Sequence, residues 1–162
     1  MVKRIIKLIS AAIFSISALT AQTNIKGETL NGDIVSVSEL IKNGPVLINF
    51  WALWCQPCKA EMKHLKNIYE KYADKGFTIL GVNQDSPKSL SKVNAYLSSS
   101  MIGYPVITDP NNEIFNSVNG QVMPYSLLLN KDGEVVYKHT GYLPGDEDKI
   151  EAEILKLLKE SE

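Results

Sequence analysis

The sequence has no cluster of basic residues. Its 17 lysine and arginine side chains are nearly balanced by 18 aspartates and glutamates, for a net charge of −1. A nucleic-acid interface needs a basic patch or stripe, so this function class is excluded. The chain is not poor in apolar residues: 44% are hydrophobic and 22% charged, which excludes a disordered polymer. A length of 162 residues predicts one folded domain.

Cysteine is scarce, because Cys55 and Cys58 are the only two in the chain. A structural disulfide normally closes a long loop, since its stabilising effect grows with loop length, and this pair encloses only two residues. A zinc site needs about four ligands, and no second CxxC or HxxxH pattern exists. The spacing therefore predicts a disulfide that opens and closes. Because Cu(I) accepts fewer and softer ligands, a copper site formed with Met123 is the alternative.

Hydrophobic runs long enough to span a membrane comfortably are also missing. The apolar run at residues 8–21 has 14 residues and follows a basic start, whereas a membrane-spanning helix needs about 20. A basic start, a short apolar stretch and small residues near its end are typical of a secretory signal peptide. We therefore expect a signal peptide at 1–21 and a mature domain at 22–162 that works in the periplasm or otherwise outside the cytoplasm. An uncleaved amino-terminal anchor is the alternative.

The rest of the chain alternates predicted strands and helices without repeats. Asn31-Gly32 predicts a hairpin turn, and the continuous apolar run 46–51 predicts a strand buried on both faces. The other elements expected from hydrophobic spacing and turn residues are helices at 55–73, 90–97, 112–118 and about 150–158, a strand at 77–83, and a hairpin of strands 126–130 and 134–139. This order predicts an α/β fold, with a mixed sheet and helices on both faces.

The segment FWALWCQPCKAE, residues 50–61, places CxxC after a buried strand and at the start of a helix, which indicates a thioredoxin-like domain. A second segment, VMPYSLLLNKDGEVV at 122–136, follows an inserted region after the second buried strand. Together with the amino-terminal hairpin, these features resemble the TlpA/ResA-type extracytoplasmic thiol-disulfide oxidoreductases. The resemblance runs from about Asn24 to the end of the chain and implies the thioredoxin-like fold, with a hairpin before it and an insertion after the βαβ unit.

Three positions depart from the pattern of the family. Thioredoxins proper have a buried aspartate at the position of Asn49, and an asparagine cannot accept a proton there. Many members have a proline at the position of Lys63, so we expect no proline kink in this helix. Threonine or valine is commoner at the position of Met123, which changes the surface offered to a partner.

The resemblance and the helix start together assign roles to the cysteines. Cys55 begins the helix, where free N–H groups and the dipole favour a thiolate, so it is the expected nucleophile. Cys58 is the expected resolving thiol, which breaks the mixed disulfide with a partner. Pro57 restricts the two-residue spacer. Trp54 abuts Cys55 and is expected to offer a partner surface.

The resemblance also implies that Pro124 is cis and lies against the cysteines. The backbone of Met123, just before it, would then pair with an extended segment of the partner chain. We expect neither His64 nor His139 to be a functional ligand.

Glu61 shares a helix face with Cys58. On a helical wheel it falls inside the apolar arc centred on Leu65, one turn beyond Cys58. A carboxylate on an apolar face is costly unless it is paired or neutral. We expect partial burial to raise its pKa so that it exchanges a proton with Cys58. A salt bridge to a lysine at the edge of the arc is the alternative.

The sequence therefore predicts an enzyme that exchanges a Cys55–Cys58 disulfide with cysteines of client proteins, without a cofactor. The resemblance favours a reductant, kept reduced by a membrane thiol reductase and serving cytochrome c maturation or similar tasks. We expect a monomer. A copper-delivery chaperone that uses the same two thiols is the alternative from a different class, and thiol peroxidase activity is a further one.

Overall fold

The computed structural model describes residues 24–160. The predicted signal peptide at 1–21 lies outside the described residues. Within 24–160, no helix combines the length and the apolar character needed to cross a membrane.

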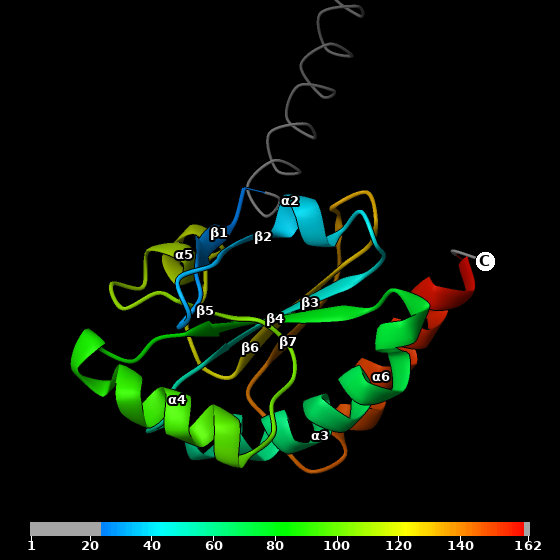
Figure 1. Ribbon diagram of the computed structural model, residues 1–162. Helices are drawn as coiled ribbons and strands as arrows, with labels where there is room; N and C mark the ends of the chain where they lie inside the picture. The colour runs from blue at the N-terminus through cyan, green and yellow to red at the C-terminus, as the bar shows by residue number, and fades with distance from the viewer. Residues whose placement is uncertain (1–23, 161–162) are drawn as a thin grey trace, which may run out of the picture.

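A five-stranded mixed sheet forms the centre of the domain, in the order β5-β4-β3-β6-β7 (Figure 1). The strands are β3 (Val46–Trp51), β4 (Thr78–Asn83), β5 (Val106–Thr108), β6 (Tyr125–Leu129) and β7 (Val135–Thr140). The first three run parallel, whereas β6 and β7 are antiparallel to their neighbours. Every residue of β3 is buried, because the strand is central and both faces of the sheet are covered. The predicted mixed sheet is confirmed.

Helices lie on both faces, as predicted. One face is covered by α3 (Gln56–Tyr72), α4 (Leu90–Ser99) and α6 (Asp146–Glu160), and the other by α2 (Val37–Leu40) and α5 (Glu113–Ser117). Alternate residues of β3 enter the two apolar layers: Leu47 and Trp51 pack under α3, whereas Ile48 and Phe50 pack on the opposite side. Asn49 is thus a polar residue on the α3 side of a buried strand.

The amino-terminal hairpin predicted at Asn31-Gly32 is present. Strand β1 (Lys26–Glu28) pairs antiparallel with β2 (Ile34–Ser36), and Gly32 in the turn has a φ of +89°, which favours glycine. A bridge between Thr29 and Ile107 attaches the hairpin to the β5 edge of the sheet.

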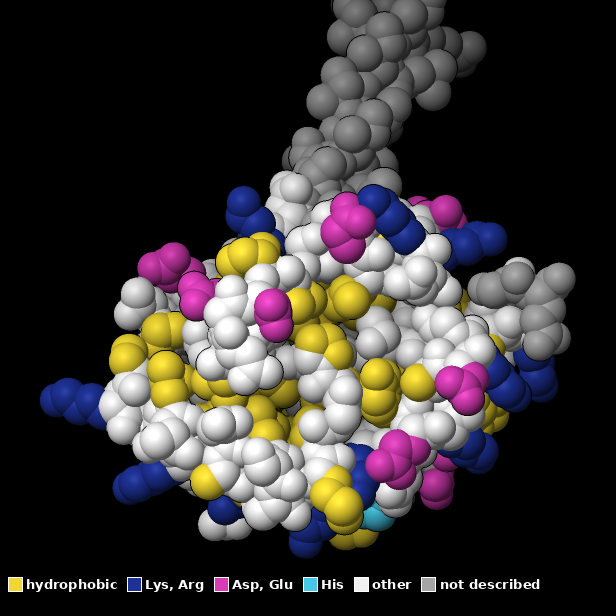
Figure 2. Space-filling model, in the orientation of Figure 1, with side chains coloured by type: hydrophobic (Ala, Val, Ile, Leu, Met, Phe, Trp, Pro, Cys, Tyr) yellow, Lys and Arg dark blue, Asp and Glu magenta, His cyan; other side chains and the backbone are white. Residues whose placement is uncertain are grey.

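The inserted region after β4 contributes a short helix η2 (Pro87–Ser89), then α4, β5 and α5. Strand β5 and helix α2 were not among the predicted elements, because segments of three and four residues are too short to show a period. On the face shown in Figure 2, lysine and acidic side chains are interspersed, and no single-sign patch covers that face.

Candidate active site

The two cysteines form a disulfide at the start of α3. Cys55 is the residue that caps the helix, with an extended backbone, and its Sγ accepts a hydrogen bond of 3.3 Å from the Cys58 N–H. Cys58 is fully buried, whereas Cys55 keeps 5% of its surface exposed. Cys55, the less buried of the two residues, is at the helix start, where free N–H groups stabilise a negative charge.

The loop between β3 and Cys55 is held from the end of the neighbouring strand β4. Asp85 accepts hydrogen bonds from the Leu53 N–H and from Asn83 Nδ2, each at 2.8 Å. The Cys55 N–H in turn donates to the Ala52 carbonyl at 3.1 Å. Sequence reasoning missed Asp85. A carboxylate two residues after a buried parallel strand was the signal, since parallel strands end at the same edge of a sheet.

The Met123–Pro124 peptide bond is cis, which confirms the prediction. Pro124 is buried, and its carbonyl accepts a hydrogen bond of 2.8 Å from the Gly141 N–H. Met123 is partly buried and packs against the apolar cluster that contains both cysteines. Met123 thus borders the same apolar layer as the cysteines although about 65 residues separate them in the sequence.

Exposed apolar side chains lie on the surface near the disulfide. Trp54 is 68% exposed and Val122 57% exposed, and Pro57 is also exposed at the start of α3. Trp54, Val122 and Met123 line one side of a pocket of about 510 Å³. The rest of that pocket is formed by Gln84, Asn112, Phe115, Asn116, Gly120 and Gln121. An apolar surface beside a reactive disulfide suits contact with a polypeptide partner.

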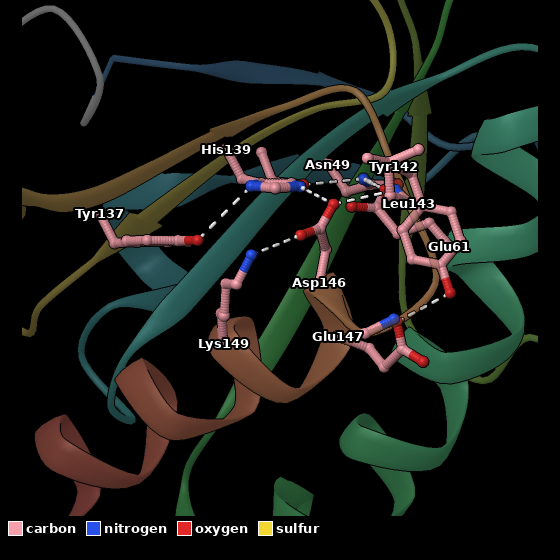
Figure 3. Close-up of polar contacts among 11 residues, drawn as sticks. Asn49, Glu61, Tyr137, His139, Tyr142, Leu143, Asp146, Glu147 and Lys149 are labelled. Atoms are coloured by element: carbon pink, nitrogen blue, oxygen red, sulfur yellow. Dashed lines mark hydrogen bonds and ion pairs between the residues drawn. The ribbon is translucent and has the colours of Figure 1, made fainter.

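Glu61 is fully buried on α3, one turn beyond Cys58. Its Oε2 accepts a hydrogen bond of 2.7 Å from Asn49 Nδ2, which also donates to Ser126 Oγ at 3.0 Å (Figure 3). The pKa of Glu61 is raised to about 7, mainly by burial. The hydrogen bond from Asn49 lowers this pKa, whereas the negative charge of Asp146 raises it. No ion pair joins Glu61 to a lysine within residues 24–160, so the salt-bridge alternative is wrong.

The arrangement can perform thiol-disulfide exchange. Cys55 keeps a small exposed surface, Cys58 is fully buried, and a carboxyl group with a pKa near neutrality lies one helical turn beyond Cys58. A carboxyl group that is half ionised near pH 7 can both accept and return a proton. At the position where thioredoxins proper have a buried aspartate, this chain has Asn49. Its buried acid is instead Glu61, which comes from helix α3.

Known proteins are similar to this chain in sequence. A sequence model of the redoxin family matches residues 18–154. The thiol-disulfide oxidoreductase ResA of Halalkalibacterium halodurans is 30% identical over 132 residues, which cover 82% of this chain and 72% of that protein. ResA of Bacillus subtilis is 32% identical over 127 residues, which cover 78% and 69%.

Solved structures agree. A putative thiol:disulfide interchange protein DsbE from Chlorobium tepidum superposes with a TM-score of 0.77 at 27% identity, over 85% of this chain and 94% of the other. A putative protein disulfide isomerase from Bacteroides thetaiotaomicron gives 0.73 at 26% identity, over 83% and 86%. With the disulfide at the start of α3 and the cis-proline, these similarities show that the chain belongs to the redoxin family and is a thioredoxin-like thiol-disulfide oxidoreductase of the TlpA/ResA type.

Proposed function

We propose that this enzyme reduces disulfides of client proteins outside the cytoplasm, with Glu61 as the proton acceptor for Cys58. The observation that carries the proposal is the fully buried Glu61 one turn from the fully buried Cys58. Solvent reaches neither group, so a proton that leaves Cys58 needs an acceptor inside the protein.

The reaction proceeds in two exchanges. The Cys55 thiolate attacks a client disulfide, which forms a mixed disulfide and releases one client thiolate. Cys58 then gives its proton to the Glu61 carboxylate, and the resulting thiolate attacks Cys55 Sγ. The mixed bond breaks, the Cys55–Cys58 disulfide forms, and the second client thiolate leaves and takes up a proton. Two electrons pass to the client, and the structure corresponds to the oxidised product.

The position of Glu61 also supports a reductant over an oxidant. Strongly oxidising pairs owe their potential to a reduced form that is heavily stabilised, largely as a thiolate. An ionised carboxylate one turn from Cys58 works in the opposite direction, because it repels a second negative charge on the sulfur. The reduced form is therefore less stabilised, and the pair gives up its electrons more readily.

The client surface comprises the exposed Trp54 and Pro57 on one side of the disulfide and Met123 on the other. An extended client segment would pair with the backbone of Met123, while a side chain next to the client cysteine enters the pocket that Trp54 and Met123 line. A membrane thiol reductase would return the disulfide to the dithiol. Cytochrome c maturation is the pathway that the resemblance suggests, with the enzyme acting as a monomer.

The reduction potential of the Cys55–Cys58 pair tests the reductant role. The oxidised fraction, measured in glutathione or dithiothreitol redox buffers, should give a potential below about −200 mV, towards the value for thioredoxin. A value well above about −200 mV would reassign the enzyme to disulfide formation.

The location of the protein needs its own experiment. Expression of the full chain in a Gram-negative host, followed by fractionation and amino-terminal sequencing, should find the mature protein in the periplasm, starting near residue 22. Membrane-bound protein that still carries residues 1–21 would favour the uncleaved anchor instead.

A further inference from the structure

A row of polar side chains crosses the sheet from Asn49, the hydrogen-bond partner of Glu61, to the edge strand β7. In the strand register Asn49 pairs with Ser126, and Ser126 pairs with His139, so the three lie side by side on β3, β6 and β7. All three face α3 and α6, because Asn49 reaches Glu61 on α3 and His139 reaches α6. Neighbouring strands are about 4.8 Å apart, so His139 lies about 10 Å from Asn49 along this row.

His139 lies against Asp146, the first residue of α6. Its Nε2 lies 3.3 Å from Asp146 Oδ2, and the two side chains are only 15% and 13% exposed. Figure 3 shows Asp146 between His139 and Lys149, whose Nζ donates at 2.9 Å. The Lys149 hydrogen bond and a second one from the Leu143 N–H lower the pKa of Asp146. Asp146 is therefore a fixed negative charge at neutral pH, on the same buried face as Glu61.

The other titratable groups that face Glu61 are neutral near pH 7. Burial raises the pKa of Tyr104, before β5, and that of Tyr137 on β7. Burial raises the pKa of Tyr142, after β7, to about 12. A phenol with a raised pKa carries no charge in the range where thiol exchange takes place. Cys58, its neighbour on α3, is the reacting thiol.

One cluster of charged groups at the start of α6 comprises Asp146, its partner His139, and Lys149. Lys149 is 71% exposed, so solvent screens its charge. His139 is the member of the cluster that carries a charge only when it is protonated.

We propose that His139 and Asp146 are positioning residues that set the charge state of Glu61, and through it the proton transfer from Cys58. This inference rests on the proposed role of Glu61. The Asp146 carboxylate disfavours a second negative charge on Glu61, and a proton on His139 cancels that effect. The pair acts across Ser126 and Asn49 without touching the thiols.

Titration of the Glu61 carboxyl carbon by NMR, in the oxidised full-length protein labelled with ¹³C-glutamate, tests the proposal. Asp146→Asn should lower the Glu61 midpoint by about half a pH unit or more, as expected for a charge at this range in a partly buried site. His139→Gln should raise the midpoint. In the double variant the midpoint should lie between those of the two single variants, since a negative and a positive charge are removed together. An unmoved midpoint in either single variant would overturn the proposal.

The chain offers a matched control in its second histidine–carboxylate pair. His64 Nδ1 lies 3.5 Å from Glu147 Oε1, also at the start of α6. Glu147 is held by hydrogen bonds from the Tyr142 hydroxyl and the Gly145 N–H instead, at 2.8 and 2.9 Å. His64→Gln should therefore leave the Glu61 midpoint in place, and a shift as large as that in His139→Gln would refute a specific role for the His139–Asp146 pair.

Two further measurements separate this inference from the proposed function. Asp146→Asn keeps an oxygen for the Leu143 N–H, and circular dichroism checks that α6 is intact. Disulfide reductase activity is then followed against pH in the same variants. If the wild type is active and the Glu61 midpoint is the same in every variant, only the role of the His139–Asp146 pair is contradicted. A wild type that reduces no protein disulfide contradicts the proposed function, even where the midpoint moves.

Discussion

Two buried carboxylates near the disulfide, Asp85 and Glu61, have opposite hydrogen-bond environments. Asp85 accepts from a backbone N–H and a side-chain amide, and its own N–H donates to Asn83 Oδ1 at 3.1 Å. Glu61 accepts one hydrogen bond, from Asn49, and its Oε1 has no partner among the residues that the structure describes. The first arrangement fixes a loop. The second leaves a carboxyl group whose protonated and ionised forms are close in free energy, as its pKa of about 7 indicates.

Removal of the thiol next to Glu61 should have the largest effect. Cys58→Ser should abolish turnover and accumulate mixed disulfides between Cys55 and client proteins, because nothing resolves the first exchange. Cys55→Ser should trap none. Non-reducing gels of thiol-quenched samples measure both outcomes. Equal trapping by the two variants would mean that the roles of the cysteines are wrongly assigned, and with them the site on which Glu61 acts.

Glu61 should also make the free energy of unfolding depend on pH, with lower stability at higher pH. Its pKa is about 7 in the folded protein and 4.5 as a free side chain, so between these values the folded state binds the extra proton. The stabilisation from this proton is complete below about pH 4.5 and is lost as the pH rises through about 7. The total loss in the free energy of unfolding is about 3 kcal/mol.

Chemical denaturation of the oxidised protein at several pH values measures this dependence. Glu61→Gln should remove this decrease, because glutamine stays neutral. A decrease of the same size in the variant would assign it to other groups.

The reductase rate should fall roughly 100-fold in Glu61→Gln at neutral pH, at the low end of general acid–base effects. Glutamine keeps an oxygen for Asn49 Nδ2, so the fold should be unchanged. Stopped-flow measurement of the resolving step, with a client peptide disulfide, isolates the reaction of Cys58. A wild-type rate in the variant would leave Glu61 without a catalytic role.

Asp85→Asn should have the smallest effect and one of a different kind. It keeps one acceptor but turns the other oxygen into a donor, so we expect a loss of about 1 kcal/mol in unfolding free energy. The pH profile of the resolving step should keep its midpoint. A midpoint shifted as far as in Glu61→Gln would erase the distinction between the two carboxylates.

The sequence could predict those parts of the site that are near one another along the chain. Cys55, Cys58 and Glu61 occupy one helix, so their shared face follows from a period of 3.6 residues. The fold class followed from buried runs and turn residues, and the cis bond at Pro124 followed from family resemblance. Partial burial was predicted for Glu61, whereas the structure buries it completely.

The missed features depend on contacts between distant segments. The role of Asp85 depends on the parallel pairing of β3 and β4, which places its carboxylate within hydrogen-bonding distance of the Leu53 N–H. His139 lies at the end of a row that requires the register of β3, β6 and β7, and no local pattern shows a register across three strands. Strand β5 has only three residues, and its pairing with β4, rather than its sequence, makes it a strand.

The central claim is that Glu61 and Cys58 exchange a proton. The ultraviolet absorbance of the thiolates, followed against pH in reduced wild type and in reduced Glu61→Gln, tests it most directly. The two thiols and the carboxyl group should titrate as a coupled set in the wild type. In the variant, thiolates should form at lower pH and in simpler steps, because the neighbouring negative charge is gone. Superimposable curves would contradict the claim and leave Glu61 a structural residue.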